Sequence, residues 1–343
     1  MTRRLQVFHL NNSGSDTSLK ERAQTQTSRL PASAVTIGNF DGVHIGHQRL
    51  IALLNQHAKA RALTSCALTF EPHPREFFSA KSGVAAPPRI TTLRAKLRAL
   101  QNCGLDMVCV ARFNADMASL TPTAFLDQVL HAQLNAKLVL VGDDFRFGAG
   151  RAGDFDWLQQ TGKAHGIDVI RMDTLHVTAG GTTPDAQAHR YSSSAVRQSL
   201  AEADFLQVER LLGRPYTIEG HVLHGRKLGR SLGFPTLNLS VGSHRPALQG
   251  VFVVQVHGLK TNGIASKKPW PAVASLGTRP AVEQNGRFLL EVHCLDWQGD
   301  AYGQCVSVEF IHKLRGEANY DSLEALTKQI SLDTLAAREH FNL

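Results

Sequence analysis

The chain has 343 residues, 43% of them hydrophobic and 19% charged, and its 37 Lys and Arg against 29 Asp and Glu give a net charge of +8. This length and composition predict an ordinary globular protein of roughly two domains. The positive balance favours anionic partners such as phosphates and nucleotides, whereas the scattered basic residues, with no block of like charges, argue against a nucleic-acid-binding arm.

Cysteine usage and apolar segments bear on the compartment. The five cysteines are odd in number and show no CxxC spacing, which argues against a disulfide framework or a zinc knuckle and is typical of a reducing compartment. The N-terminal "MTRRLQVFHLNNSG" has only a short, interrupted apolar run, so no signal peptide is expected. No stretch approaches the ~18 apolar residues of a spanning helix. We therefore expect a cytoplasmic protein without a membrane partner.

The first half of the chain alternates strand-like and helix-like segments. Short apolar runs rich in β-branched residues predict strands at 34–38, 64–70, 105–111, 137–142 and 167–172. Between two of them, "TTLRAKLRALQ" has leucines at helical spacing. This alternation predicts a parallel sheet with helices on both faces, whose ligands bind in the loops after the carboxyl ends of the strands. The polar segments 11–33 and 178–190 are expected to be loops and have no functional interpretation.

The loop after the first of these strands, "GNFDGVHIGHQ", holds two histidines three residues apart. His44 and His47 flank Gly46 where the loop meets the next helix. A helix start offers unpaired N–H groups to anions, glycine allows close approach of a ligand, and the i, i+3 spacing turns both imidazoles to one side. The pattern predicts a phosphate site that stabilises charge in a transition state; the alternative is a pair of capping or surface histidines.

The second half changes character. The region 192–216 predicts two short helices, the first begun by a serine cap. The following segments "YTIEGHVLHG", "GVFVVQVHG", "PAVASLG", "RFLLEVHCLD" and "CVSVEFIHKL" are separated by Gly, Pro and Asn turns, and several alternate with period two. They predict an antiparallel sheet or small barrel. A final helical pattern over 323–335 closes the chain.

A basic, glycine-rich segment, "GRKLGRSLGFPTLN", precedes one extended stretch of this half. Gly225, Gly229 and Gly233 would permit the unusual dihedrals by which backbone N–H groups cradle phosphates; the alternative is a mobile turn with solvated Lys and Arg. It is not a Walker A loop. Thr236 and Asn238 alternate onto one face, and their hydroxyl and amide oxygens are hard ligands suited to Mg²⁺.

One carboxylate stands inside an otherwise apolar strand pattern, in "FLLEVHCLD". Leu290, Val292 and Cys294 point one way, while Glu291 and His293 point the other. Glu291 is either a functional group or an outward-facing strand residue, and His293 is expected to be structural.

These motifs together resemble a known family. "GNFDGVHIGHQ", "TFEPHPREFF", "VGDDFRFGAGRAGD" and "SSSAVR" are similar to the adenylyltransferase half of the bacterial bifunctional riboflavin kinases/FMN adenylyltransferases (FAD synthetases), and "GHVLHGRKLGRSLGFPTLNL", "SLGTRP", "LEVHCLDWQGDAYG" and "EFIHKLRGE" are similar to the riboflavin kinase half. The resemblance runs from about residue 34 to the C-terminus, in the order of the family.

The resemblance implies a fold and an activity. It implies a Rossmann-like nucleotidyltransferase domain over 1–200 and a small antiparallel β-barrel kinase domain with a terminal helix over 201–343. The enzyme would phosphorylate riboflavin to FMN and adenylylate FMN to FAD, using ATP and Mg²⁺. Its partners would be these small molecules alone, with neither nucleic acid nor membrane, and it would be a monomer or associate weakly.

The resemblance also implies residues for the adenylyl step. His44 and His47 would hold the ATP phosphates and Arg197 would neutralise the departing pyrophosphate; Arg197 is otherwise an ordinary surface charge. The whole ATP set would be Gly38, Asn39, Phe40, Asp41, His44, Gly46, His47, Ser193, Ser194 and Arg197. The flavin set would be Glu71, His73, Pro74, Asp143, Asp144 and Phe145, with Phe147 a further candidate and a core position the alternative for both phenylalanines.

For the kinase step, the resemblance implies that Glu291 is the general base for the riboflavin 5′-hydroxyl. Arg315 would contact the flavin, and Thr236 and Asn238 would hold Mg²⁺. The ATP set would be Gly225, Lys227, Gly229, Arg230, Gly233, Phe234, Thr236 and Asn238.

Departures from the family pattern and two alternatives stay open. Ser275 and Ala281 replace polar family residues near the kinase site, Asp144 stands where some members have Asn, and the segment 259–270 is a polar insertion of unknown role. An adenylyltransferase for another phosphate acceptor would not need "GFPTLN" and "LEVH". An RNA-binding protein with a decayed nucleotide site would bind RNA in a salt-sensitive way.

Overall fold

The chain forms two compact units. The structure is a computed structural model that describes residues 5–10, 30–173, 190–225, 229, 232–242, 244–261, 263–278 and 288–343. The first unit comprises Met1–Pro87 and Lys96–Tyr191, and the second Pro88–Ala95 and Ser192–Leu343. In the part of the chain so described, no helix has the length and apolar content needed to cross a membrane.

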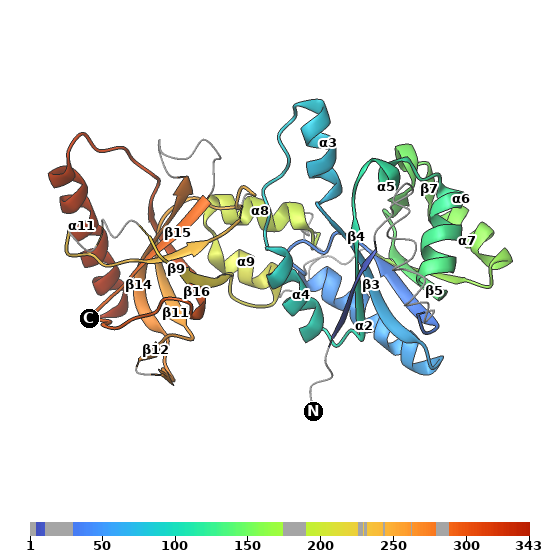
Figure 1. Cartoon of the computed structure of the whole chain (residues 1–343), viewed down its shortest axis with the longest axis horizontal. Coiled ribbons are helices and arrows are strands. Elements are labelled where there is room, and N and C mark those ends of the chain that lie inside the picture. The colour runs from blue at the N-terminus through green and yellow to red at the C-terminus, as the bar shows by residue number, and fades with distance from the viewer. Residues whose placement is uncertain are drawn as a thin grey trace, which may run out of the picture. The chain divides into compact units, whose positions relative to one another are not determined.

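A six-stranded parallel sheet is the centre of the first unit (Figure 1), in the order β1-β4-β3-β2-β5-β8. Its strands are β1 (Gln6–Leu10), β2 (Ser33–Ile37), β3 (Thr64–Glu71), β4 (Met107–Arg112), β5 (Ala136–Gly142) and β8 (Asp168–Met172). The five strands expected from the apolar runs are confirmed. Strand β1 was missed, because it lies at the sheet edge with most side chains at least partly exposed and so lacks a continuous apolar run.

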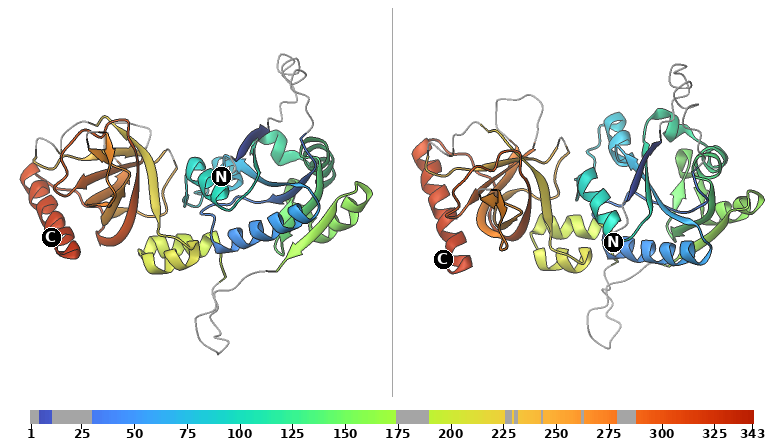
Figure 2. Two further views of the ribbon diagram at one scale, coloured as in Figure 1. Left: turned by 90° about the horizontal axis from the view of Figure 1, so that it is seen from below. Right: turned by 60° about the horizontal axis from the view of Figure 1, so that its bottom comes forward.

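Helices cover both faces of this sheet, as Figure 2 shows. They are α2 (Ile45–Ala60), α3 (Pro74–Ser82), α4 (Leu93–Asn102), α5 (Ala115–Ser119), α6 (Pro122–Ala124), the π-helix η1 (Phe125–Gln133), the short 3₁₀-helix η2 (Ala149–Arg151) and α7 (Phe155–Ala164), with a small ribbon of β6 (Arg146–Phe147) and β7 (Gly153–Asp154). Val35 and Ile37 of β2 pack with η1 and α7, while the alternate side chains of β2 face α2.

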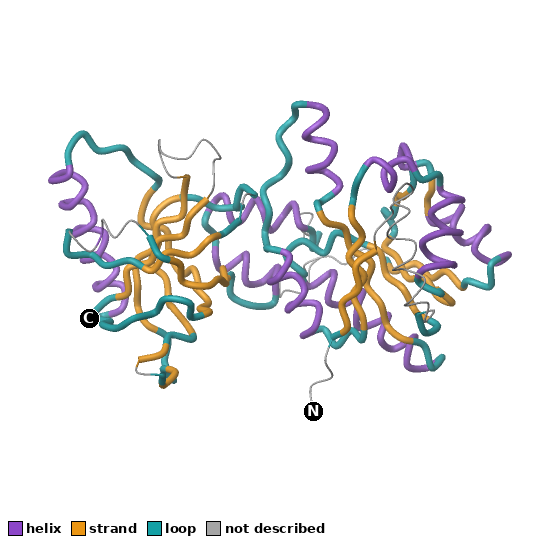
Figure 3. Tube along the Cα trace, in the orientation of Figure 1, coloured by secondary structure: helices purple, strands orange, loops and turns teal. Residues whose placement is uncertain are grey.

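The second unit is a closed antiparallel barrel in the order β10-β15-β14-β11-β16-β9 (Figure 3). Its strands are β9 (Thr217–Leu223), β10 (Leu237–Ser240), β11 (Gly250–His257), β14 (Trp270–Thr278), β15 (Phe288–Cys294) and β16 (Cys305–Arg315), and the expected insertion at 259–270 carries a hairpin, β12 (Lys260–Thr261) and β13 (Ile264–Ala265). The expected small barrel is confirmed.

Within the described ranges, this unit also has the helices α8 (Ser193–Glu202), α9 (Phe205–Leu212) and α11 (Leu323–Phe341). Ser192 caps α8 by accepting a hydrogen bond from the Ala195 amide, as expected. The terminal helix α11 packs on the outer face of the barrel, where Ala337 is buried with Val251, Val253 and Val273.

A short segment of the first half of the sequence is built into the second unit. Residues 88–95 form a β-bridge at Arg89 with Pro246, and the Tyr216 hydroxyl donates to the Ile90 carbonyl at 3.1 Å. We call residues 88–95 the strap. Because of it, the chain crosses between the units three times. A division of the two activities at residues 200 and 201 stays a prediction, since compactness does not locate catalysis.

Candidate functional site

The histidine loop of the first unit lies at the carboxyl end of β2. This strand lies between β3 and β5. The next two strands of the chain, β3 and β4, are added on one side of β2, whereas β5 and β8 are added on the other side. Such a reversal of strand order opens a crevice above the strand ends, where ligands of parallel sheets bind. Helix α2 begins there at Ile45, with His44 as its N-cap.

The turn leading to this helix is strained and buried. Phe40 and Val43 have φ of 48° and 42°, values that cost of order 1–3 kcal/mol each for side chains of this size. Both side chains are almost wholly buried, and the Phe40 ring lies 3.1 Å from where a Cβ atom on Gly38 would be. Packing thus holds a turn that the local sequence disfavours.

The two imidazoles stack on each other at the start of α2. Their centroids are 3.7 Å apart with an interplanar angle of 21°, and His44 Nδ1 accepts from the His47 amide at 3.4 Å. Burial, with smaller effects of His44 and Lys96, holds the pKa of His47 well below its usual value. His47 is therefore neutral at pH 7.

Polar atoms at this turn lack internal partners. His47 Nδ1, Asn39 Oδ1 and Thr36 Oγ1 are buried without a hydrogen-bond partner among the described residues. A Cβ atom on Gly46 would lie 3.1 Å from the His44 ring and 3.3 Å from Tyr191 Cβ, so a larger residue would press on the His44 ring. Since unsatisfied buried polar atoms are costly, these groups suit a polar ligand.

A buried lysine also belongs to this region, and the sequence analysis missed it. Lys96, on α4, is 3% exposed, and its Nζ lies 3.4 Å from Thr69 Oγ1. The leucine spacing of "TTLRAKLRALQ" marked a helix, but the pattern did not reveal that a cation shares its apolar face.

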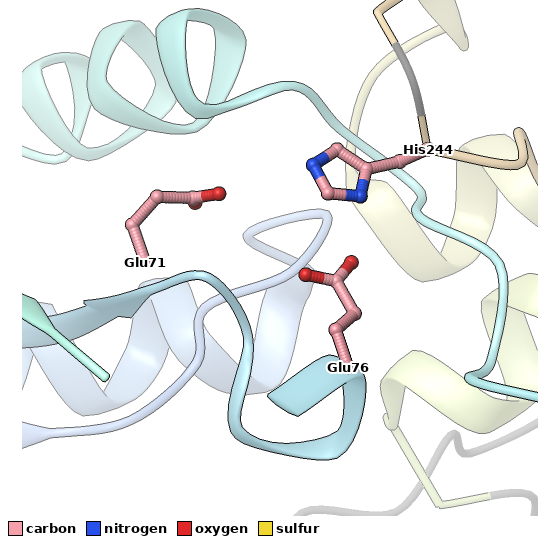
Figure 4. A group of neighbouring side chains, drawn as sticks. All are labelled: Glu71, Glu76 and His244. Carbon is pink, nitrogen blue, oxygen red and sulfur yellow. The ribbon is translucent and has the colours of Figure 1, made fainter. Parts of the chain in front are cut away.

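Residues expected on the flavin side lie at the β3–α3 junction. His73 caps α3, its Nδ1 accepting from the Arg75 amide at 3.1 Å, and the Glu76 carboxylate accepts from the His73 amide at 3.0 Å. Pro74 is the first residue of the helix. Carboxylate oxygens of Glu71 and Glu76 lie within 4.8 Å of each other, and Figure 4 shows these two side chains.

An aromatic cluster borders the same junction. Phe70, Phe77, Phe78 and Phe113 make edge-to-face contacts with centroids 5.4–5.8 Å apart, and Phe78 is 50% exposed. Phe70, Phe77 and Phe78 belong to the motif "TFEPHPREFF", but no individual role was expected for them, because aromatic positions in an α/β domain are usually core.

The remaining expected flavin residues follow β5. Asp144 accepts a hydrogen bond from Arg190 at 2.8 Å, and Asp143 lies 3.8 Å from the same guanidinium. Phe145 is partly buried and stacks on Phe147 at 5.3 Å. Phe147 is buried.

The second expected nucleotide motif lies on α8, in the second unit. Ser193 and Ser194 are its first residues. Arg197 follows one turn later and donates from Nε to the Pro88 carbonyl of the strap at 2.7 Å.

In the barrel, strand register brings the expected site residues Asn238 and Glu291 into one row with Ser275, a departure from the family pattern. Asn238 of β10 pairs with Glu291 of β15, and Glu291 pairs with Ser275 of β14. Cross-strand partners share a face, and Leu290 and Val292 are buried on the opposite one. Asn238 is 6% exposed, and its Oδ1 lacks a hydrogen-bond partner within the described ranges.

Glu291 and Ser275 line a cavity of about 600 Å³ between the barrel wall and α11. Arg315, at the end of β16, lines it too and donates three hydrogen bonds of 2.7–3.1 Å to the buried Asp333 of α11. Asp333 also strengthens proton binding by the guanidinium, raising the pKa of Arg315. A Cβ atom on Gly277 would overlap the Glu317 carboxylate, so glycine leaves room for that side chain.

A second cavity of about 240 Å³ adjoins the first. Trp297 and Tyr302 line it, and the His224 ring lies 3.9 Å from that of Tyr302. Thr236 lines both cavities. Trp297 and Tyr302 were not expected as site residues, because they belong to an exposed-looking turn segment.

The glycine-rich segment matches its expected role only in part. Gly233 has φ of 88°, but Gly225 and Gly229 do not have positive φ; they are required by space instead. A Cβ atom on Gly225 would lie 2.5 Å from Asn238 Nδ2, and one on Gly229 would meet the Phe234 carbonyl oxygen. Lys227 and Arg230 lie outside the described residues, as does Ala281.

His293 anchors the end of this segment. Its Nδ1 lies 2.9 Å from the Pro235 carbonyl oxygen, and its ring meets that of Phe234 edge-on at 5.5 Å. The expected structural role of His293 therefore consists of holding the 232–236 stretch against β15.

Two family models match successive parts of the chain, and curated relatives cover about nine-tenths of it. The family model described as FAD synthetase matches residues 26–183, and the one described as riboflavin kinase matches residues 212–341. The chain is 44% identical to the bifunctional riboflavin kinase/FMN adenylyltransferase of Escherichia coli (strain K12), covering 90% of this chain and 93% of that protein. It is 43% identical to the protein of the same name from Pseudomonas fluorescens, covering 88% and 91%. A crystal structure named as a macrolide-efflux protein from Streptococcus pneumoniae has a TM-score of 0.69 and 26% identity, covering 97% of this chain and 98% of that chain.

Proposed function

The chain belongs to the bifunctional riboflavin kinase/FMN adenylyltransferase family, and from this premise we propose which residues carry out each step. The protein is a transferase that converts riboflavin to FMN and FMN to FAD, with ATP as the donor in both reactions. The residue roles and the metal below are proposals.

The kinase step is assigned to the row of Asn238, Glu291 and Ser275, and the pairing of Asn238 with Glu291 is the observation that carries this assignment. Riboflavin occupies the 600 Å³ cavity, which we call the kinase cavity, with its 5′-hydroxyl at Glu291. ATP occupies the 240 Å³ cavity, with its phosphates at Thr236, which lines both. The hydroxyl oxygen bonds to the γ-phosphorus, ADP leaves, and the Glu291 carboxylate accepts the proton.

The donor set of the kinase row fits Mg²⁺. Asn238 offers a buried oxygen that no described residue satisfies, and Thr236 offers a hydroxyl; oxygen donors of this kind suit Mg²⁺. The ion would neutralise phosphate charge. Thr236 and Asn238 would hold the ion.

The adenylyl step is assigned to the histidine loop. His44, His47 and Asn39 bind phosphate oxygens at the start of α2, where the helix dipole also favours anions. An oxygen of the FMN phosphate bonds to the α-phosphorus and pyrophosphate leaves with the electron pair. Glu71, His73 and the aromatic cluster with Phe78 form the flavin side, because an exposed ring edge at the same end of the sheet suits an aromatic substrate.

The proposed function also includes a compartment, a class of partners and an assembly state. We propose that the enzyme acts in the cytoplasm on small molecules alone, as a monomer or weak assembly. Supporting this compartment, the buried sulfurs of Cys66 and Cys109 lie 3.8 Å apart as free thiols.

Two matched variants test these assignments. With riboflavin, ATP and Mg²⁺, Glu291→Gln should lower FMN formation by a factor of about 10²–10⁴ while leaving conversion of added FMN to FAD intact. His44→Ala should do the reverse. Chromatographic separation of the flavins measures both steps, and loss of both activities in either variant would contradict the assignment.

A further inference from the structure

Lys96 is a buried lysine, which is rare in globular proteins. It is 3% exposed in the first turns of α4, one turn before the buried Leu100. Fully buried lysines are rare because the ammonium group loses its hydration. Arg98, two residues later, is exposed on the same helix. Lys96 thus differs from its neighbouring cations in facing the interior.

Its ammonium group points to the histidine loop. Lys96 Nζ lies 3.4 Å from Thr69 Oγ1, and this hydroxyl donates to the Asn39 carbonyl at 3.3 Å. Thr69 is close to the carboxyl end of β3, and Asn39 follows β2. The ammonium group of Lys96 therefore lies close to the carboxyl ends of β2 and β3.

The charge of Lys96 lowers the pKa of His47, a residue assigned to the phosphate site. Lys96 and His44 both add to the burial that lowers the pKa of His47. His47 is consequently neutral at pH 7 and carries no permanent charge for a triphosphate. Lys96 carries a positive charge, and a cation in a poorly hydrated site interacts strongly with anions.

We propose that Lys96 is a phosphate-binding residue of the adenylyltransferase site, whose buried ammonium group, held by Thr69, binds the triphosphate of ATP beside His47. When the bond between the α-phosphorus and its bridging oxygen breaks, the electron pair leaves with pyrophosphate, and Lys96 stabilises that charge. The proposal rests on the assignment of the FMN-to-FAD step to the first unit.

Lys96→Met tests the role of the charge, with Arg98→Met as the matched control and riboflavin phosphorylation by the same sample as an internal control for the second unit. We expect the KM for ATP in FAD formation and the inhibition constant of pyrophosphate to rise about 10- to 100-fold, as for a lost charge-assisted hydrogen bond. The KM for FMN should change little, and Arg98→Met should resemble the wild type. Unchanged values for ATP and pyrophosphate in Lys96→Met would overturn the proposal.

Two further measurements separate binding from structure. In Lys96→Met, one cause of the low pKa of His47 is gone, so the acid limb of the pH profile for FAD formation should move to higher pH; an unmoved limb contradicts the proposal. Should Lys96→Met fail to fold, Lys96→Gln replaces it: the Gln side chain can still bond to the Thr69 hydroxyl but carries no charge, and a wild-type KM for ATP would refute the role of Lys96. A wild-type protein that forms no FAD would instead refute the assigned function.

Discussion

Replacing Asp333 by Asn tests whether α11 and the end of β16 act as one wall of the kinase cavity. Asp333 is 6% exposed and accepts three hydrogen bonds from Arg315 and one from Gln329 at 3.0 Å. The Asn side chain keeps the shape but removes the charge that faces the guanidinium.

The magnitude follows from how buried the pair is. Breaking a buried ion pair costs about 3–5 kcal/mol, but the Arg315 side chain is 24% exposed and can recover some hydration. We therefore expect the free energy of unfolding of the second unit to fall by about 2–3 kcal/mol. A unit of this size would then melt about 4–12 °C lower.

Calorimetry and flavin kinetics together measure the effect. Asp333→Asn should also raise the KM for riboflavin several-fold, because Arg315 lines the kinase cavity, while FMN-to-FAD conversion stays unchanged. Asp321→Asn, an exposed carboxylate just before α11, is the matched control. If Asp333→Asn melted and phosphorylated riboflavin like this control, the reasoning would be wrong.

Three other predictions concern pH, thiols and a glycine. Folding lowers the pKa of His47, so the contribution of this residue to stability is complete above the unfolded pKa of about 6.5 and is lost as the pH falls below it. The free energy of unfolding in urea should therefore be smaller at pH 5.5 than at pH 7.5. A His47→Gln variant should show a smaller difference. Burial raises the pKa of Cys294 to about 12, so iodoacetamide at pH 8 should label the exposed Cys305 and leave Cys294 unmodified until urea is added, as peptide mass spectrometry would reveal. Gly277→Ala would displace the Glu317 carboxylate into the kinase cavity. We expect the KM for riboflavin to rise several-fold and the free energy of unfolding to change by less than about 1 kcal/mol. An unchanged KM would contradict this prediction.

Local patterns were sufficient for the elements that bury continuous apolar runs. Strands β2 to β5, β8 and five of the barrel strands (β9, β11, β14, β15 and β16) follow from apolar runs and period-two alternation, because burial on one or both faces leaves that trace in the sequence. Strand β1 does not, since an edge strand with exposed side chains needs no apolar run.

The candidate sites depend on long-range geometry that local patterns do not carry. The loop of His44 and His47 was identifiable because a helix start and its cap are local features. The pairing of Asn238 with Glu291 requires the register of two strands, and the burial of Lys96 depends on which face of α4 is covered. The cavity position of Trp297 likewise requires the closed barrel.

The strap has a consequence for how the protein emerges from the ribosome. Its partners, among them Tyr216 and Pro246, are translated more than 100 residues later, so residues 88–95 leave the exit tunnel before anything exists for them to bind. At about 5–20 residues per second the wait is on the order of 6–30 s. During that time the first unit can fold only around an undocked excursion of its own chain, and final assembly must wait for the barrel.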